Sequence, residues 1–172
     1  NAPFLWVVIE FMYHLRPIQP QDNAQIAHII RETSKEFGLA PELGFAVADP
    51  ILDDLYTVYT QAYAQYWVVE NEHGEIFGGG GISKLKGDSS ILEIQKMYFL
   101  PKIRGLGLAK QLLEHAFDFA AQHGFKVCYL ETTQQLKQAL KLYEKLGFIY
   151  LHHPLGNTGH SHACEIWMKK EL

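Results

Sequence analysis

The hydrophobic pattern of this chain changes its period at Pro101, and few folds accommodate such a change. Before Pro101 there are strand-like segments separated by turn signals, at residues 66–70, 76–85 and 91–100. After it, apolar residues recur at helical spacing as far as Gly124, which predicts an amphipathic helix. A strand, a turn, a helix and a further strand imply a crossover between parallel strands. We therefore expect an antiparallel meander that is extended by a parallel pair.

The remaining segments predict helices and short strands on either side of this meander. Asp22 is positioned to cap a first helix, and Asp49 followed by Pro50 is typical of the start of a second. The expected strands are residues 13–16, 127–131, 148–153 and 162–169. The expected helices are residues 22–37, 49–59, 108–124 and 136–146. We expect an α+β fold, with a mixed, mostly antiparallel central sheet and helices on both faces.

Four consecutive glycines, Gly78–Gly81, lie inside the second strand-like segment. A glycine-rich phosphate loop requires a following helix and usually a Lys-Ser/Thr pair, and neither follows here. We interpret these glycines as a bulge or as a close approach of the backbone to a neighbour.

Length and charge restrict the function classes. With 172 residues the chain has room for one domain, which we expect at residues 13–172 after an N-terminal extension at residues 1–12. The net charge of -4 gives no reason to expect nucleic acid as a partner. The apolar run Pro3–Met12 is too short to span a bilayer and lacks the basic leader of a signal peptide. We expect no membrane partner, and a cytoplasmic protein in which Cys128 and Cys164 are buried thiols on strands.

The segment from Arg104 to Ala109 predicts an anion site. It follows a strand and opens a helix, and Gly105 and Gly107 let a ligand approach the backbone. Free N–H groups at the start of a helix and the positive end of its dipole favour a pyrophosphate, beside the charge of Arg104. The dinucleotide fingerprint G-x-G-x-x-G is not met, because residue 110 is lysine.

Two motifs in this half of the chain resemble those of the GNAT acetyltransferases. The run Arg104-Gly105-Leu106-Gly107-Leu108-Ala109 satisfies the family pattern R/Q-x-x-G-x-G/A. Further on, Ala139-Leu140-Lys141-Leu142-Tyr143-Glu144-Lys145-Leu146-Gly147-Phe148 resembles the second signature, A-x-x-L-Y-x-K-x-G-F. The resemblance extends over residues 13–169. It implies the GNAT fold, with a sheet of about six or seven strands whose parallel fourth and fifth strands splay apart around the cofactor.

The resemblance also implies where acetyl-CoA binds. The pantetheine arm is expected to pair with backbone groups of Met97, Tyr98 and Phe99. The pyrophosphate is expected on the backbone amides of Arg104, Gly105, Leu106, Gly107, Leu108 and Ala109. Many family members have Asn where this chain has Leu136, so one pantetheine contact is either missing or supplied by Thr132 or Gln135. The chemistry of the family needs no metal.

Acetyl transfer to an amine needs a base for the amine and a proton for the departing thiolate. Tyr143 matches the family tyrosine that reprotonates the sulfur of CoA, and its alternative role is that of a core aromatic residue. Glu93 lies on the strand that leads into the phosphate loop, where some family members place a general base, and an apolar cleft would raise its pKa. A solvated strand glutamate is the alternative for Glu93. Strand alternation predicts that Glu93, Gln95 and Met97 share one side.

Histidines cluster around the last loop, at His152, His153, His160 and His162. Their spacing matches no closed zinc site, so we expect no metal. In GNAT proteins this region often borders the acceptor pocket. Asn157, Thr158 and His160 are therefore candidate substrate contacts, with a simple turn as the alternative.

Tyr56, Tyr59 and Tyr63 lie in a segment that resembles the variable acceptor wall of the family. They recur at helical spacing, so packing in the core explains them as well as contact with a ligand does.

We expect an acetyl-CoA-dependent N-acetyltransferase that transfers the acetyl group directly, in a ternary complex, to the primary amine of a small-molecule or amino-acid-like acceptor. A protein lysine or N-terminal acetyltransferase would need an open groove instead of a closed pocket, and it stays open as a second hypothesis. A non-catalytic CoA-binding sensor or interaction module is the hypothesis of another class, and Tyr143 and Glu93 argue against it. We also consider a homodimer, with the apolar run at residues 3–11 as an interface strand or arm.

Overall fold

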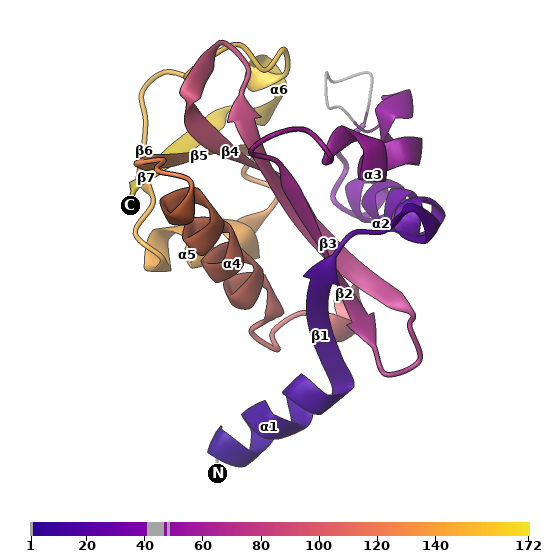
Figure 1. Cartoon of the computed structure of the whole chain (residues 1–172). Helices are drawn as coiled ribbons and strands as arrows, with labels where there is room; N and C mark the ends of the chain where they lie inside the picture. The colour runs from indigo at the N-terminus through magenta and orange to yellow at the C-terminus, as the bar shows by residue number, and fades with distance from the viewer. Residues whose placement is uncertain (1, 41–46, 48) are drawn as a thin grey trace.

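Seven strands form one sheet in the order β1-β2-β3-β4-β5-β7-β6. The structure is a computed structural model that describes residues 2–40, 47 and 49–172 (Figure 1). The strands are β1 (Tyr13–Pro17), β2 (Gln65–Asn71), β3 (Ile76–Leu85), β4 (Asp88–Phe99), β5 (Val127–Thr132), β6 (Ile149–Tyr150) and β7 (Ile166–Glu171). The long helices are α1 (Ala2–Met12), α2 (Asn23–Glu36), α4 (Leu108–Gln122) and α5 (Lys137–Lys145). Short helical turns are η1 (Pro20–Asp22), η4 (Pro50–Asp54), α3 (Leu55–Val58), η5 (Pro101–Ile103) and α6 (Ser161–Cys164).

The parallel pair β4–β5 interrupts an otherwise antiparallel sheet. These two strands pair only at Leu92 with Cys128 and at Glu93 with Tyr129. Beyond these pairs the strands diverge, because β4 continues beside β3 while β5 continues beside β7. The predicted mixed sheet with a splayed parallel pair is confirmed.

Helices cover both faces of the sheet (Figure 1). Tyr66 and Val68 of β2 pack with α2 and α3, whereas Trp67 between them packs with α4 and α5 on the opposite face. The alternation follows from the period of a strand, in which successive side chains point to opposite faces. The core is therefore two apolar layers, one on each side of the sheet.

Two aspartates that the sequence marks as helix caps behave differently. Asp49 accepts the backbone N–H of Ile51 at 3.0 Å and opens η4, which leads into the single turn α3. Asp22 lies directly before α2, but its carboxylate accepts hydrogen bonds from both terminal nitrogens of the Arg16 guanidinium, at 2.7 and 2.9 Å. Asp22 holds the predicted N-cap position of α2, but its side chain makes no capping hydrogen bond, because the guanidinium of Arg16 offers the buried carboxylate a bidentate pair.

The segment before β7 also differs from the prediction. The strand expected at residues 162–169 begins only at Ile166, and the strand expected at residues 148–153 is short. Cys164 therefore lies on the helical turn α6, where its backbone N–H bonds the carbonyl of His160. Glu165 ends this turn with a φ of 52°, after which the chain can pair with β5.

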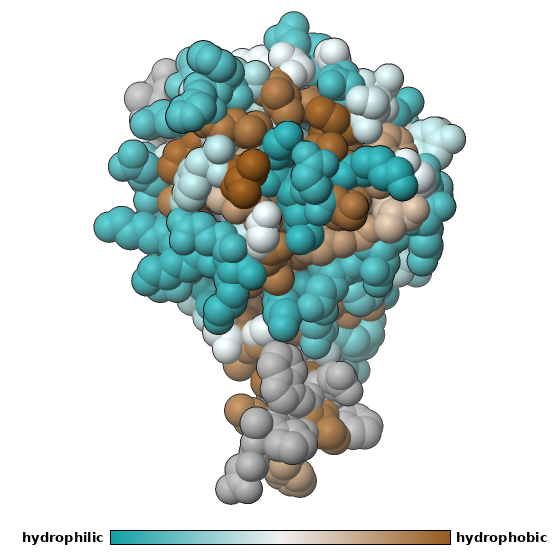
Figure 2. All heavy atoms as spheres, turned by 90° about the vertical axis from the view of Figure 1, so that its left-hand side faces the viewer, coloured by the Kyte–Doolittle hydropathy of each residue, from teal (hydrophilic) through white to brown (hydrophobic). Residues whose placement is uncertain are grey.

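The N-terminal extension forms the helix α1 and not a strand. Among its residues, Phe4, Leu5, Val7 and Val8 are exposed. The helix projects from the lower end of the molecule in Figure 1, and brown, apolar atoms are visible at that end in Figure 2. A homodimer built on this helix stays a prediction. None of the helices in the described part of the chain has the length and apolar character needed to cross a bilayer.

The glycines Gly78–Gly81 of β3 lie where bulky residues press against the strand. A Cβ atom at Gly79 would lie 2.6 Å from the ring of Tyr66 and 2.7 Å from the carbonyl oxygen of Trp67. The register with β4 also shifts between Gly79 and Gly81. The close approach is confirmed, whereas the bulge at this position belongs to β4, whose extra residue lies opposite the glycines.

Replacing Gly79 by alanine should destabilise the protein by about 1 to 3 kcal/mol, because the added methyl group overpacks a rigid backbone contact. Urea unfolding measures the effect, with Ser83→Ala on the same strand as the control. Ser83 is only partly buried, so its variant should stay within about 0.5 kcal/mol of wild type. A Gly79→Ala protein as stable as the control would contradict the steric explanation.

Candidate active site

A bulge in β4 decides which of its side chains reach the site. Gln95 pairs with Gly81 and Tyr98 with Gly79, so Lys96 and Met97 together oppose Gly80. Lys96 takes a φ of 50°, and such an extra residue reverses the alternation that follows it. Met97 therefore packs against the α4 face, and Tyr98 packs on the α2 face. The prediction that Met97 shares a side with Glu93 and Gln95 is wrong for this reason.

Glu93 is buried, with a relative exposure of 4%. Burial raises its pKa to about 7, helped by the charge of Glu131 and opposed by a hydrogen bond from Gln95. The amide of Gln95 donates to Glu93 at 2.5 Å, and the hydroxyl of Tyr59 donates to the amide oxygen of Gln95 at 2.7 Å. Tyr59 thus fixes the orientation of the groups that hold the carboxylate. A carboxyl group with a pKa near neutrality can accept and release protons under physiological conditions.

A pocket opens beside Glu93, on the α2 side of the sheet. It is lined in part by Ser34, Gln95, Lys96, Tyr98, Glu131, His160 and Cys164. Burial lowers the pKa of Lys96 and, despite the opposing charge of Glu131, that of His160. The pocket therefore holds both acidic and basic groups away from bulk water.

Tyr143 of α5 lies on the other side of the sheet, in the apolar layer that contains α4. Its relative exposure is 6%. Burial raises its pKa well above the usual value, and the nearby Tyr98 adds to this effect. The phenol is therefore protonated at neutral pH, which is the state that a proton donor requires.

The turn between η5 and α4 has the geometry expected of an anion site. Gly105 and Gly107 adopt φ values of 76° and 82°, which only glycine tolerates without strain. A Cβ atom at Gly105 would meet no atom within 4 Å, so the turn faces open space. Within the described chain no side chain caps α4 at Gly107, and the first N–H groups of a helix have no partner inside it. Leu106, Leu108 and Ala109 contribute backbone groups to this turn.

Arg104 of the same turn is held by the protein itself. Its guanidinium makes two hydrogen bonds of 2.7 Å to the carboxylate of Glu36 and one of 3.0 Å to the carbonyl of Phe99. It also lies 5.1 Å from the centre of the Phe37 ring. Arg104 therefore ties the end of α2 to the turn, a partnership that the local sequence does not reveal.

The two alternative pantetheine contacts differ in what they offer a ligand. Thr132 ends β5 at the place where β4 has diverged, and its buried hydroxyl has no hydrogen-bond partner within the described structure. The amide oxygen of Gln135 is already engaged by the hydroxyl of Thr133. A buried hydroxyl without a partner costs stability unless a ligand satisfies it, so Thr132 fits this role better than Gln135.

The last loop brings one of its three candidate substrate residues to the pocket. His160 lines it, whereas Thr158 donates to the carboxylate of Glu131 at 2.5 Å. Asn157 is exposed, and its backbone N–H bonds the carbonyl of Lys86 at 2.6 Å. Thr158 and Asn157 therefore hold the loop in place.

Several pocket residues did not stand out in the sequence, namely Gln95, Lys96, Glu131 and Cys164. For Glu131 a signal exists, since it is a carboxylate near the carboxyl end of a buried strand that is parallel to its neighbour. Tyr63 packs away from the pocket on His123 and Phe125. Among the three tyrosines of the expected acceptor wall, only Tyr59 bonds a side chain of the pocket.

Comparisons with known proteins agree with this geometry. The profile of the Acetyltransferase (GNAT) family matches residues 27–148. YjgM of Escherichia coli K12, an uncharacterized N-acetyltransferase, is 55% identical over 159 residues, which are 92% of this chain and 94% of YjgM. The PaiA N-acetyltransferase of Thermoplasma acidophilum, solved with coenzyme A, has a TM-score of 0.73 at 16% identity over 93% of this chain and 99% of its own. A phosphinothricin acetyltransferase of Sinorhizobium meliloti, solved with acetyl-CoA, has a TM-score of 0.71 at 19% identity. The match covers 94% of this chain and 89% of that acetyltransferase.

The raised pKa of Glu93 predicts a pH-dependent loss of stability. Its carboxyl group titrates near 7 in the folded chain and near its ordinary value of 4.5 in the unfolded chain. Between these values the folded state binds more protons, so the free energy of unfolding falls as the pH rises through this window. Glu93→Gln removes the charge and should be more stable than wild type at pH 8, by on the order of 2 to 3 kcal/mol.

Urea unfolding at pH 8 and at pH 4.5 measures the difference in stability between Glu93→Gln and wild type. This difference should nearly vanish at the lower pH, which equals the ordinary pKa of glutamate. Glu72→Gln is the matched control, because the Glu72 side chain is 67% exposed. The control should stay within about 0.5 kcal/mol of wild type at both pH values. A Glu93→Gln protein less stable than wild type at pH 8 would show that the buried carboxylate is satisfied when ionised.

Proposed function

This chain belongs to the GNAT family of acetyltransferases, and from that membership we propose that it transfers the acetyl group of acetyl-CoA to the primary amine of a small-molecule or amino-acid-like acceptor. The family match and the relatives show an acyltransferase. Two structural neighbours were solved with coenzyme A or acetyl-CoA, which supports the choice of donor.

The observation that carries the proposal is the position of Glu93. It is the last residue of β4 that pairs with β5, so its carboxylate stands at the point where the two strands separate. Its pKa near 7 suits a general base. The pocket beside it is the place where an amine could meet a thioester that enters between the diverging strands.

The proposed reaction is a direct transfer in a ternary complex. Glu93 accepts a proton from the amine, and the amine nitrogen forms a bond to the thioester carbonyl carbon. A backbone N–H near Tyr98 or Phe99 stabilises the negative charge that develops on the carbonyl oxygen. The carbon–sulfur bond then breaks, and the hydroxyl of Tyr143 gives its proton to the departing sulfur. Glu93 then releases its proton to solvent and Tyr143 regains one from solvent, so neither residue is consumed.

The pocket favours an amino-acid-like acceptor. Lys96 lines the pocket together with Glu93, and its side chain interacts with the charge of Glu93. An ammonium group can pair with an acceptor carboxylate while Glu93 receives the amine. An acceptor that carries both groups would engage both residues.

Release of CoA thiol from acetyl-CoA, measured across a panel of amines, amino acids and peptides, tests the proposal. Amino-acid-like amines should give acceptor-dependent release, and Tyr143→Phe should lower kcat by roughly tenfold or more, since it removes the proton donor. Tyr150→Phe is the control, because Tyr150 is 50% exposed on β6.

Three other results of this assay would contradict parts of the proposal. Release with lysine-containing peptides alone would favour a protein acetyltransferase. Binding of acetyl-CoA without release for any acceptor would favour a sensor. Equal activities of Tyr143→Phe and Tyr150→Phe would assign Tyr143 to the core only.

Thr132→Val tests the proposed pantetheine contact. The variant removes a buried hydroxyl without a partner, so it should be at least as stable as wild type while KM for acetyl-CoA rises about fivefold, the equivalent of one hydrogen bond. Thr33→Val is a matched control, because Thr33 has the other buried hydroxyl without a partner in the described chain. It lies on α2, and its variant should leave KM unchanged. An unchanged KM in Thr132→Val would remove this residue from the cofactor site.

A further inference from the structure

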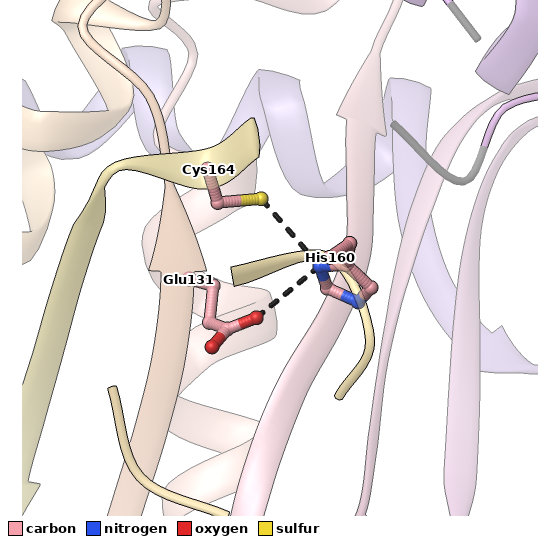
Figure 3. A group of neighbouring side chains, drawn as sticks. All are labelled: Glu131, His160 and Cys164. Carbon is pink, nitrogen blue, oxygen red and sulfur yellow. Dashed lines mark hydrogen bonds and ion pairs between the residues drawn. The ribbon is translucent and has the colours of Figure 1, made fainter. Parts of the chain in front are cut away.

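Three potential metal ligands from two distant segments meet in the wall of the pocket. Glu131 comes from β5, His160 precedes α6 and Cys164 lies on α6 (Figure 3). The Nδ1 atom of His160 lies 3.2 Å from Oε1 of Glu131 and 3.5 Å from Sγ of Cys164. All three ligand atoms lie within 4.8 Å of one another.

The geometry does not suit a nucleophilic relay. In a relay of the Ser-His-Asp kind, the nucleophile and the carboxylate contact opposite nitrogens of the imidazole ring. Here the thiol of Cys164 and the carboxylate of Glu131 both approach the Nδ1 atom of His160 (Figure 3). One nitrogen cannot take a proton from the thiol while it donates one to the carboxylate.

The same geometry suits a shared cation. In a tetrahedral zinc site with Zn–N near 2.05 Å, Zn–O near 2.1 Å and Zn–S near 2.3 Å, nitrogen lies roughly 3.4 Å from oxygen and roughly 3.6 Å from sulfur. The observed separations of 3.2 and 3.5 Å are close to these values. Nitrogen, oxygen and thiolate sulfur together are donors that zinc accepts.

Glu131 has the supporting contacts that an oriented ligand needs. Its side chain is 1% exposed. The hydroxyl of Thr158 bonds Oε1, whereas the hydroxyls of Tyr129 and Ser161 bond Oε2. Hydrogen bonds of this kind orient ligating carboxylates in metal sites. They leave Oε1 as the atom that faces His160.

We propose that Glu131, His160 and Cys164 bind one Zn²⁺ ion, with its fourth position open toward the pocket that Glu93 lines. Binding displaces the proton of the Cys164 thiol, so the sulfur binds as thiolate and one proton is released. The histidine spacing gave no sign of this site, because two of the ligands are not histidines and Glu131 lies on β5, far from the last loop in sequence. The proposal does not depend on the acetyltransferase reaction.

Titration of the purified 172-residue chain with Co²⁺, a spectroscopic substitute for Zn²⁺, tests the site. One equivalent should give the near-ultraviolet charge-transfer band of a cobalt–thiolate bond, and Zn²⁺ should displace the Co²⁺. Cys164→Ala should abolish the band and weaken metal binding by roughly 100-fold. Cys128→Ala is the matched control, since Cys128 is the second free cysteine and is buried in the core. His162→Ala, which alters an exposed histidine of the same turn, should also keep the band.

X-ray absorption at the zinc edge of the wild-type protein makes the test independent of how the variants fold. One sulfur and two or three nitrogen or oxygen neighbours would support the site. Absence of the cobalt–thiolate band in wild type would overturn the proposal. So would a zinc shell without sulfur, or a band that persists in folded Cys164→Ala.

Discussion

The parallel strands β4 and β5 share two residue pairs and then separate, and the candidate site is organised around this separation. Each strand keeps a partner on its outer side, β3 for β4 and β7 for β5, so the sheet continues although its centre opens. Glu93 is the last paired residue of β4, and Glu131 and Thr132 lie just past the last paired residue of β5. The carboxylates of Glu93 and Glu131 thereby line a pocket, and the buried hydroxyl of Thr132 has no hydrogen-bond partner in the described structure.

The glycines of β3 and the buried carboxylate of Glu93 belong to one packing arrangement. Because Gly79 and Gly81 lack side chains, the rings of Tyr66 and Tyr59 lie directly against the strand. The hydroxyl of Tyr66 then reaches the carbonyl of Lys96 at 2.8 Å, at the bulge of β4, while that of Tyr59 reaches the amide that bonds Glu93. The absence of side chains at Gly79 and Gly81 of β3 thus lets two tyrosines hold the backbone of Lys96 and the side chain next to Glu93 on β4.

The sequence predicted those features that depend on neighbouring residues along the chain. The turn at Gly105 and Gly107 and the amphipathic helices follow from local backbone preferences and periodicity, and the order of strands follows from crossover rules. The side of Met97 could not be predicted, because a bulge leaves little trace in the pattern of apolar residues. Glu36, the carboxylate partner of Arg104, lies 68 residues away. The loop partners of Glu131 lie 27 and 30 residues away, and local sequence patterns do not predict contacts over such separations.

The hydrogen bonds of the buried Glu131 affect how the loop that contains α6 can open. The Glu131 carboxylate is buried, and two of its three hydroxyl partners, Thr158 and Ser161, come from that loop. If one partner left, a charged group would remain partly unsatisfied in a medium of low polarity, which is costly. The contacts therefore depend on one another, and we expect the segment from Thr158 to Cys164 to open as a small cooperative unit instead of fraying residue by residue.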